Sequence, residues 1–115
     1  MALHELKSPS ELQSFITTKP NAVICFSATW CGPCTASKPD LMSMAESYHR
    51  DPLVDVSFGI IYENSLGESI HEYRITAFPT YVLFVGGNEE GRVQGVNFDG
   101  IRRLIEVQGK GCKAV

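Results

Sequence analysis

The 115-residue sequence lacks several features, and each absence excludes a class of protein. No run approaches the roughly 18 consecutive apolar residues of a membrane-spanning helix. The formal net charge is -3, so the basic surface that nucleic acid or an anionic membrane requires is missing. The first segment, MALHELKSPSELQSF, has no basic stretch followed by an apolar run, so no secretory signal is predicted.

The remaining composition is that of one globular domain. Hydrophobic residues make up 43% of the chain and charged residues 20%, which is ordinary for a domain with its own core. Without an export signal, we expect a cytoplasmic protein. Disulfides are rare in that reducing compartment, so its four cysteines are expected to be catalytic, metal-binding or inert rather than structural.

Helix caps and apolar runs predict four helices and four strands. Ser8 is an N-cap, Pro9 suits the first helical position, and Glu11 completes a capping box. The apolar run at 22–28 lacks alternation, which is typical of a strand covered on both faces. The predicted order is a helix from Pro9, a strand at 22–28, a helix after Cys34, a strand at 53–62, a helix capped by Ser65 and Glu68, strands at 80–85 and 92–96, and a helix capped by Asn97.

This order predicts an α/β fold with a central mixed sheet and helices on both faces. Strands separated by a helix pair in parallel through a right-handed crossover. The last two strands, joined by a Gly-rich turn, form an antiparallel hairpin. The domain is expected to span residues 1–107, and the polar, Gly-rich residues 108–115 are expected to form a flexible tail.

The segment WCGPC at 30–34 carries the chemistry. Cys31 follows a predicted strand and opens a helix, where unpaired N–H groups and the helix dipole favour a thiolate. Cys34 lies in the first turn, close enough to form a disulfide with Cys31. Gly32 permits close approach of another backbone, Pro33 stiffens the loop, and Trp30 offers an apolar shoulder beside the sulfur.

A redox cycle follows from this spacing. The exposed Cys31 thiolate attacks a disulfide in a partner protein, and the more buried Cys34 then attacks Cys31 and releases the partner reduced. A zinc site is the main alternative, but zinc needs four ligands, and the other cysteines and histidines are scattered singly: Cys25, Cys112, His4, His49 and His71. We therefore expect no metal and no cofactor.

The chain resembles the thioredoxin family over nearly its full length. The resemblance rests on WCGPC, on Pro39 inside the helix, on FPT at 78–80, and on Gly87 and Gly95. It implies a thioredoxin fold, a monomer that reduces protein disulfides, and a thioredoxin reductase-type electron donor. It also implies a cis bond between Phe78 and Pro79, and a substrate groove bordered by Trp30, Gly32, Pro33, Phe78, Pro79 and Gly95.

The sequence departs from the family at the places that usually hold charge beside the cysteines. Cys25 stands where members of the family usually have a buried aspartate, and Thr35 stands where they usually have a basic residue after the second motif cysteine. The neighbouring strand carries Ile60 and Tyr62 in place of the usual lysine or acid. A buried thiol is a poor base. We therefore expect a less charged site, in which another group or water takes the proton from Cys34, or in which reduction is slowed.

Two other functions remain open at this point. A thioredoxin-like docking or regulatory module with weak redox activity is favoured by the missing acid and by the linker-like GKGCKAV end. Cys112 in this end is expected to be an incidental exposed thiol. A disulfide-forming oxidase is disfavoured, because Gly-Pro between the cysteines and the absence of an export signal point to a reductant.

Overall fold

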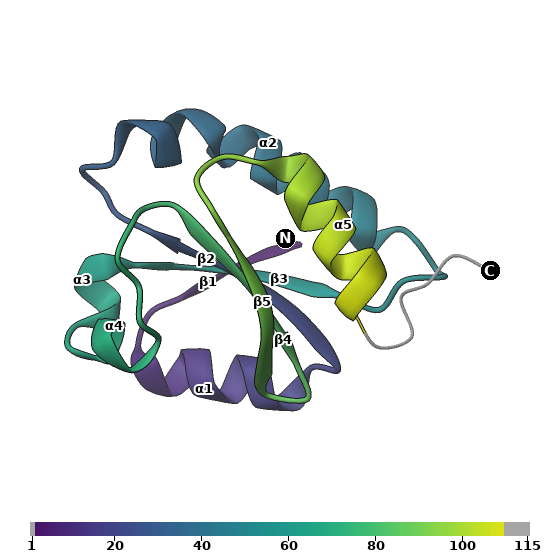
Figure 1. The fold of residues 1–115 in the computed structure, drawn as a ribbon, viewed down its shortest axis with the longest axis horizontal. Helices are drawn as coiled ribbons and strands as arrows, with labels where there is room; N and C mark the ends of the chain where they lie inside the picture. Colours follow the sequence, from purple (N-terminus) through teal and green to yellow (C-terminus); the bar gives the residue numbers. More distant parts are fainter. Residues whose placement is uncertain (1, 110–115) are drawn as a thin grey trace.

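A five-stranded sheet forms the centre of the fold in the computed structural model, which describes residues 2–109 (Figure 1). The strands lie in the order β1-β3-β2-β4-β5. Strands β1, β3 and β2 are parallel, whereas β4 and β5 run antiparallel to their neighbours. Their bounds are Leu3–Leu6 for β1, Asn21–Ser27 for β2, Ser57–Tyr62 for β3, Thr80–Val85 for β4 and Asn88–Gln94 for β5.

Helices cover both faces of this sheet, as the sequence predicts (Figure 1). Helices α2 and α5 pack on one face through Leu41, Met44, Ile101 and Ile105. Helix α1 packs on the other face together with Leu66 of α3. The helices are α1 (Pro9–Thr18), α2 (Gly32–His49), α3 (Glu63–Leu66), α4 (Ser69–Glu72) and α5 (Phe98–Gln108).

Local sequence explains where the longer helices begin. Ser8 caps α1 by accepting a hydrogen bond from the Glu11 amide at 3.1 Å, and the Glu11 carboxylate accepts from the Lys7 amide. Asn97 caps α5 by accepting from the Gly100 amide at 2.9 Å. Both N-caps are confirmed. Each satisfies a backbone donor that the helix itself leaves without a partner.

The structure corrects four predicted elements. Strand β1 is missing from the prediction, β3 begins at Ser57 rather than at residue 53, and β5 spans Asn88–Gln94 rather than 92–96. The helix predicted from Ser65 is wrong, because Gly67 adopts a φ of 60° and separates two short helices, α3 and α4. Of the tail expected at 108–115, Gln108 belongs to α5, and residues 110–115 lie outside the described residues.

Strand β2 places the cysteine motif at the edge of the core. All seven of its residues are buried, which accounts for the absence of alternation at 22–28. It pairs with β3 on one side and with β4 on the other, so its path is fixed along its whole length. The chain leaves the carboxyl end of β2 and enters α2 within a few residues. Cys31 therefore lies where ligands bind in open α/β sheets.

A side chain at Gly59 on β3 is expected to crowd the core. A Cβ at this position would lie 3.0 Å from Leu6, 3.2 Å from Ile24 and 3.3 Å from Phe15. Because all three neighbours are buried in the core, we expect Gly59→Ala to destabilise the protein by about 1–3 kcal/mol in urea unfolding. Gly32→Ala is the control, since no atom outside its chain neighbours and the backbone of its own helix lies within 4 Å of its Cβ position. Equal stabilities for the two variants would contradict this account of the packing.

Candidate active site

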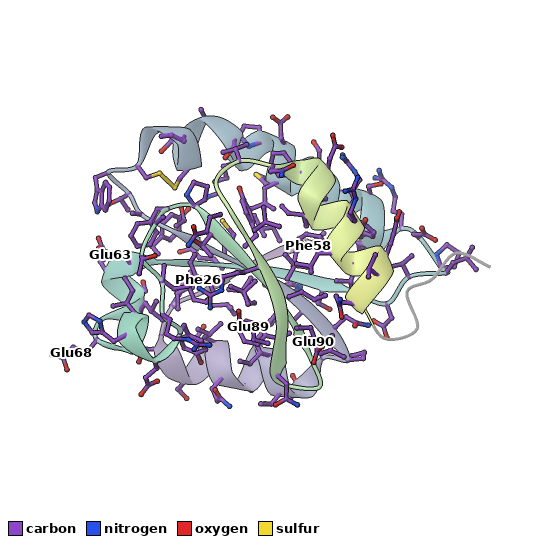
Figure 2. The ribbon with its side chains drawn as sticks, in the orientation of Figure 1. Phe26, Phe58, Glu63, Glu68, Glu89 and Glu90 are labelled. Carbon is purple, nitrogen blue, oxygen red and sulfur yellow. A yellow bond between two sulfur atoms is a disulfide. The ribbon has the colours of Figure 1, made fainter. Side chains whose placement is uncertain are left out.

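The two motif cysteines form a disulfide at the beginning of α2 (Figure 2). Cys31 is the N-cap of α2, and its sulfur accepts a hydrogen bond from the Cys34 amide at 3.2 Å. The two Cα atoms are 5.3 Å apart, within the range that a disulfide spans. Gly32 and Pro33 are the first residues of the helix, where proline loses no hydrogen bond. The predicted position of Cys31 is therefore confirmed.

The expected contrast in burial between the two cysteines is wrong for this disulfide form. Cys31 is 5% exposed and Cys34 is 6% exposed. Both belong to one buried cluster with Ala28, and Phe78 packs against this cluster. Trp30, by contrast, is 67% exposed. The apolar surface beside the disulfide is thus supplied mainly by a tryptophan rather than by the sulfur atoms.

The segment before β4 lies directly against Cys31. The bond between Phe78 and Pro79 is cis, as the resemblance implied. The Cys31 sulfur is 3.6 Å from the Phe78 carbonyl oxygen. The Phe78 ring meets the Trp30 ring edge to face, with centroids 5.6 Å apart. Gly95 donates its amide hydrogen to the Pro79 carbonyl at 2.8 Å, so these predicted groove residues lie together at one end of the sheet.

Pro39 stands apart from this cluster. It lies inside α2, more than one turn beyond Cys34. A proline at this place removes one backbone hydrogen bond from the helix. It therefore shapes the helix that carries the cysteines and does not itself line the groove.

Glu63 is a site residue that the sequence reasoning missed. Its carboxylate accepts a hydrogen bond from the indole nitrogen of Trp30 at 2.7 Å. Glu63 begins α3, directly after β3. The available signal was its place at the carboxyl end of a predicted strand next to β2. That signal was lost because the following helix was predicted to begin only after Ser65.

Lys38 brings a positive charge to the neighbourhood of the motif, contrary to the expected scarcity of charge. Its amine donates to the Tyr62 hydroxyl at 2.8 Å, and this hydrogen bond raises the pKa of Lys38. Lys38 and Tyr62 border an open pocket of about 260 Å³, whose other lining residues are Ser27, Ala28, Thr29 and Thr35. Thr35 and Tyr62 are uncharged, as noted from the sequence, but Lys38 supplies the charge from one helical turn further along.

Cys25 occupies the interior beneath α2 and cannot act as a base near neutral pH. Its side chain is 3% exposed, and burial raises the pKa of its thiol to about 12. It lies opposite Tyr81 on the neighbouring strand, and burial together with the neighbouring Cys25 raises the pKa of the Tyr81 hydroxyl. Ser37 donates to the Pro33 carbonyl at 2.7 Å. A neutral cluster of Cys25, Tyr81 and Ser37 thus fills the place of the family's buried acid.

The described part of the chain holds neither a metal-binding cluster nor a membrane-spanning helix. Within residues 2–109, no three His, Cys, Asp or Glu side chains gather closely enough to hold a metal ion. In the same part of the chain, no helix has the length and hydropathy to cross a membrane.

Comparison with known proteins gives a consistent result. The sequence model of the Thioredoxin family matches residues 4–107. Thioredoxin H2-2 of Oryza sativa subsp. japonica is 34% identical over 109 residues, which cover 93% of this chain and 78% of that protein. Thioredoxin-1 of Saccharomyces cerevisiae is 34% identical over 101 residues, or 88% of this chain and 93% of that protein.

Solved structures agree with the sequence comparison. A thioredoxin from Nicotiana alata superposes with a TM-score of 0.83 at 27% identity, covering 95% of this chain and 94% of the other. A mixed sheet with a cysteine pair at the start of a central helix defines a thiol–disulfide oxidoreductase of the thioredoxin fold. The chain belongs to the thioredoxin family, whose members act on disulfide substrates and are reduced by thioredoxin reductase.

Proposed function

We propose that the chain is a general protein-disulfide reductase in which Cys31 attacks the substrate and Cys34 releases it. The observation that carries this proposal is the position of the Cys31 sulfur. It caps α2, accepts a hydrogen bond from the Cys34 amide and lies beside the Phe78 carbonyl. The helix dipole and the amide donor both favour a thiolate at this point.

The reaction transfers two electrons in two exchanges. In the reduced protein, the Cys31 thiolate forms a bond to one substrate sulfur, and the other substrate sulfur leaves as a thiolate that takes up a proton. Cys34 then loses its proton and attacks the Cys31 sulfur. The bond between Cys31 and the first substrate sulfur breaks, this sulfur leaves as a thiolate and is protonated, and the Cys31–Cys34 disulfide remains. A reductase of the thioredoxin reductase type returns two electrons to this disulfide.

Substrate docking uses the exposed surface around the disulfide. Trp30, Gly32, Pro33, Phe78, Pro79 and Gly95 border the proposed groove. The exposed Trp30 ring supplies an apolar contact, and the backbone of Phe78 pairs with an extended substrate segment. Pro39 supports the site through α2. The protein acts as a monomer in the cytoplasm, where it carries electrons and contributes to cell redox homeostasis.

A second function, a docking or regulatory module with weak redox activity, is favoured by one observation. The place beneath Cys34 holds a thiol whose pKa is about 12 rather than a carboxylate. No base in that position takes the Cys34 proton near neutral pH. If proton removal limits the cycle, turnover is slow and binding becomes the main property of the fold.

Insulin reduction separates the two functions. With NADPH and a thioredoxin reductase, we expect sustained turnover that depends on the concentration of this protein. Activity with dithiothreitol but not with the enzyme would keep the reductase function and change the electron donor. Binding of disulfide-containing proteins without insulin reduction under either condition would support the docking module instead. The protein with both motif cysteines replaced by serine is the control for uncatalysed reduction.

A further inference from the structure

Arg92 of β5 and Gly95, the residue directly after β5, hold the two ends of the segment that carries Phe78. At one end, Arg92 donates from Nη1 to the Arg74 carbonyl and from Nη2 to the Tyr73 carbonyl, both at 2.9 Å. At the other end, the Gly95 amide donates to the Pro79 carbonyl at 2.8 Å. Residues 73–79 therefore run between two anchors, Arg92 and Gly95, which are three residues apart in the sequence.

Arg92 is itself held in the orientation that these bonds need. Its Nε donates to Glu89 Oε2 and its Nη2 donates to Glu89 Oε1, each at 2.8 Å. The hydrogen bond between them lowers the pKa of Glu89 and raises that of Arg92, so both are charged near neutral pH. The planar guanidinium thus joins a carboxylate on one side to two backbone carbonyls on the other, which a lysine cannot do.

The segment between the anchors has other restraints near Phe78, namely the bond from Thr80 Oγ1 to the Ala77 carbonyl at 2.7 Å and the contact of the Phe78 ring with Trp30. Arg74 adopts a φ of 55°, a conformation that is unfavourable for a residue with a side chain and persists where its surroundings impose it. Ile75 is buried and donates to the Ile70 carbonyl, but Thr76 and Ala77 are exposed. The place of Phe78 against Cys31 therefore depends in part on how firmly residues 73 and 74 are held.

We propose that Arg92 is a positioning residue for substrate docking, because its bonds to the Tyr73 and Arg74 carbonyls fix the segment that presents Phe78. This inference rests on the proposed docking role of Phe78. Arg92 does not touch the sulfur atoms, so its contribution is to the binding of extended protein substrates. The exchange of electrons at Cys31 itself needs no help from it.

The proposal is tested by comparing a protein substrate with a small one. In Arg92→Met, we expect KM for insulin to rise about threefold to tenfold, which is typical of coupling through a packed segment. The kcat, and the rate with a small aromatic disulfide such as dithiobis(nitrobenzoate), should stay within about twofold of the parent. Arg92→Lys should recover little of the loss, since it cannot bridge the same three partners.

Arg102→Met is the matched control. Arg102 also pairs with a carboxylate three residues away, Asp99 at 2.8 Å, but on the exposed surface of α5. Arg102→Met should change neither the KM for insulin nor the rate with the small disulfide. An equal loss with insulin and with the small disulfide in Arg92→Met would indicate general damage to the fold and overturn the positioning role. An unchanged KM for insulin in that variant would do the same.

Amide hydrogen exchange distinguishes this proposal from the docking role on which it rests. The Phe78 amide in the parent should gain protection when a substrate is trapped as a mixed disulfide. Absence of that protection would overturn the docking role and the positioning proposal together. Protection in the parent, combined with an Arg92→Met variant that binds and protects equally well, would overturn the positioning proposal alone.

Discussion

Replacement of Cys34 by serine is expected to stop the cycle half-way, with the protein joined to its substrate through Cys31. The serine hydroxyl cannot displace a thiolate from the mixed disulfide, so the covalent intermediate accumulates. Cys31→Ser should form no such intermediate. Both changes should lower reductase-coupled turnover by about a thousandfold or more, as loss of a reacting group does in other enzymes. Non-reducing electrophoresis and mass spectrometry measure the trapped species.

Alkylation of the reduced protein tests the same assignment without a substrate. The Cys31 sulfur lies at the N-terminus of α2 beside an amide donor, so its thiolate should react first near neutral pH. Cys25 is buried and should be labelled last. Faster labelling of Cys34 or Cys112 would contradict the proposed order of attack. Cys112→Ser is the control, and its turnover should equal that of the parent.

The second large effect is expected from Cys25→Asp, which restores a buried carboxyl beneath α2. The surroundings offer the Tyr81 hydroxyl as a hydrogen-bond donor and the distant charge of Lys38. These partners are too few for a carboxylate in an apolar strand, so we expect a loss of about 1–3 kcal/mol in the free energy of unfolding. Denaturant titration measures this loss, and Cys25→Ala is the control for removal of the thiol.

The pH dependence of this variant should differ from that of the parent. Burial raises the pKa of the introduced carboxyl above its unfolded value, so its contribution is most favourable below about pH 4 and is lost as pH rises toward the folded pKa. In the parent, burial raises the pKa of the Cys25 thiol from 9.0 to about 12. The contribution of this thiol to stability is therefore lost only as the pH rises between these alkaline values. Parallel stability curves for parent and variant between pH 4 and neutrality would contradict this account.

Activity of Cys25→Asp should move in the opposite direction to its stability. If a carboxylate beneath α2 accepts the Cys34 proton, release of the mixed disulfide should become faster near neutral pH. Turnover that is equal or slower in the folded variant would mean that the parent has another proton acceptor. The alternative explanation of that result would be that proton removal from Cys34 does not limit the cycle.

The parts of the fold that sequence predicted well are those with a strong local signal. The strand at 80–85 has the predicted bounds. The side chains of Ser8 and Asn97 cap their helices at the predicted positions. Strand β1 was missed because its four residues are too short to show a period, and its pairing with β3 is a long-range contact. The break at Gly67 was missed because the apolar spacing of Leu66, Ile70 and Tyr73 continues through it.

The candidate site was predictable where its residues are adjacent in sequence and obscure where they are not. Cys31 and Cys34 follow from the motif alone, and the approach of Phe78 and Gly95 followed only from resemblance to a family. Lys38 and Glu63 were missed because hydrogen bonds to Tyr62 and Trp30 join residues 24 and 33 positions apart. Arg92 lies 18 residues from its partner Arg74, and no local sequence pattern predicts their contact.

Trp30 has a consequence for how this protein is studied in solution. It is the single tryptophan of the sequence, and its ring lies against Phe78 and is hydrogen-bonded to Glu63. All tryptophan fluorescence therefore originates beside the disulfide, so emission follows oxidation, reduction and substrate binding without an added label. The same fluorescence reports local changes around Trp30 before it reports unfolding of the core. Stability of the variants is therefore better followed by far-ultraviolet circular dichroism, which averages over the whole backbone.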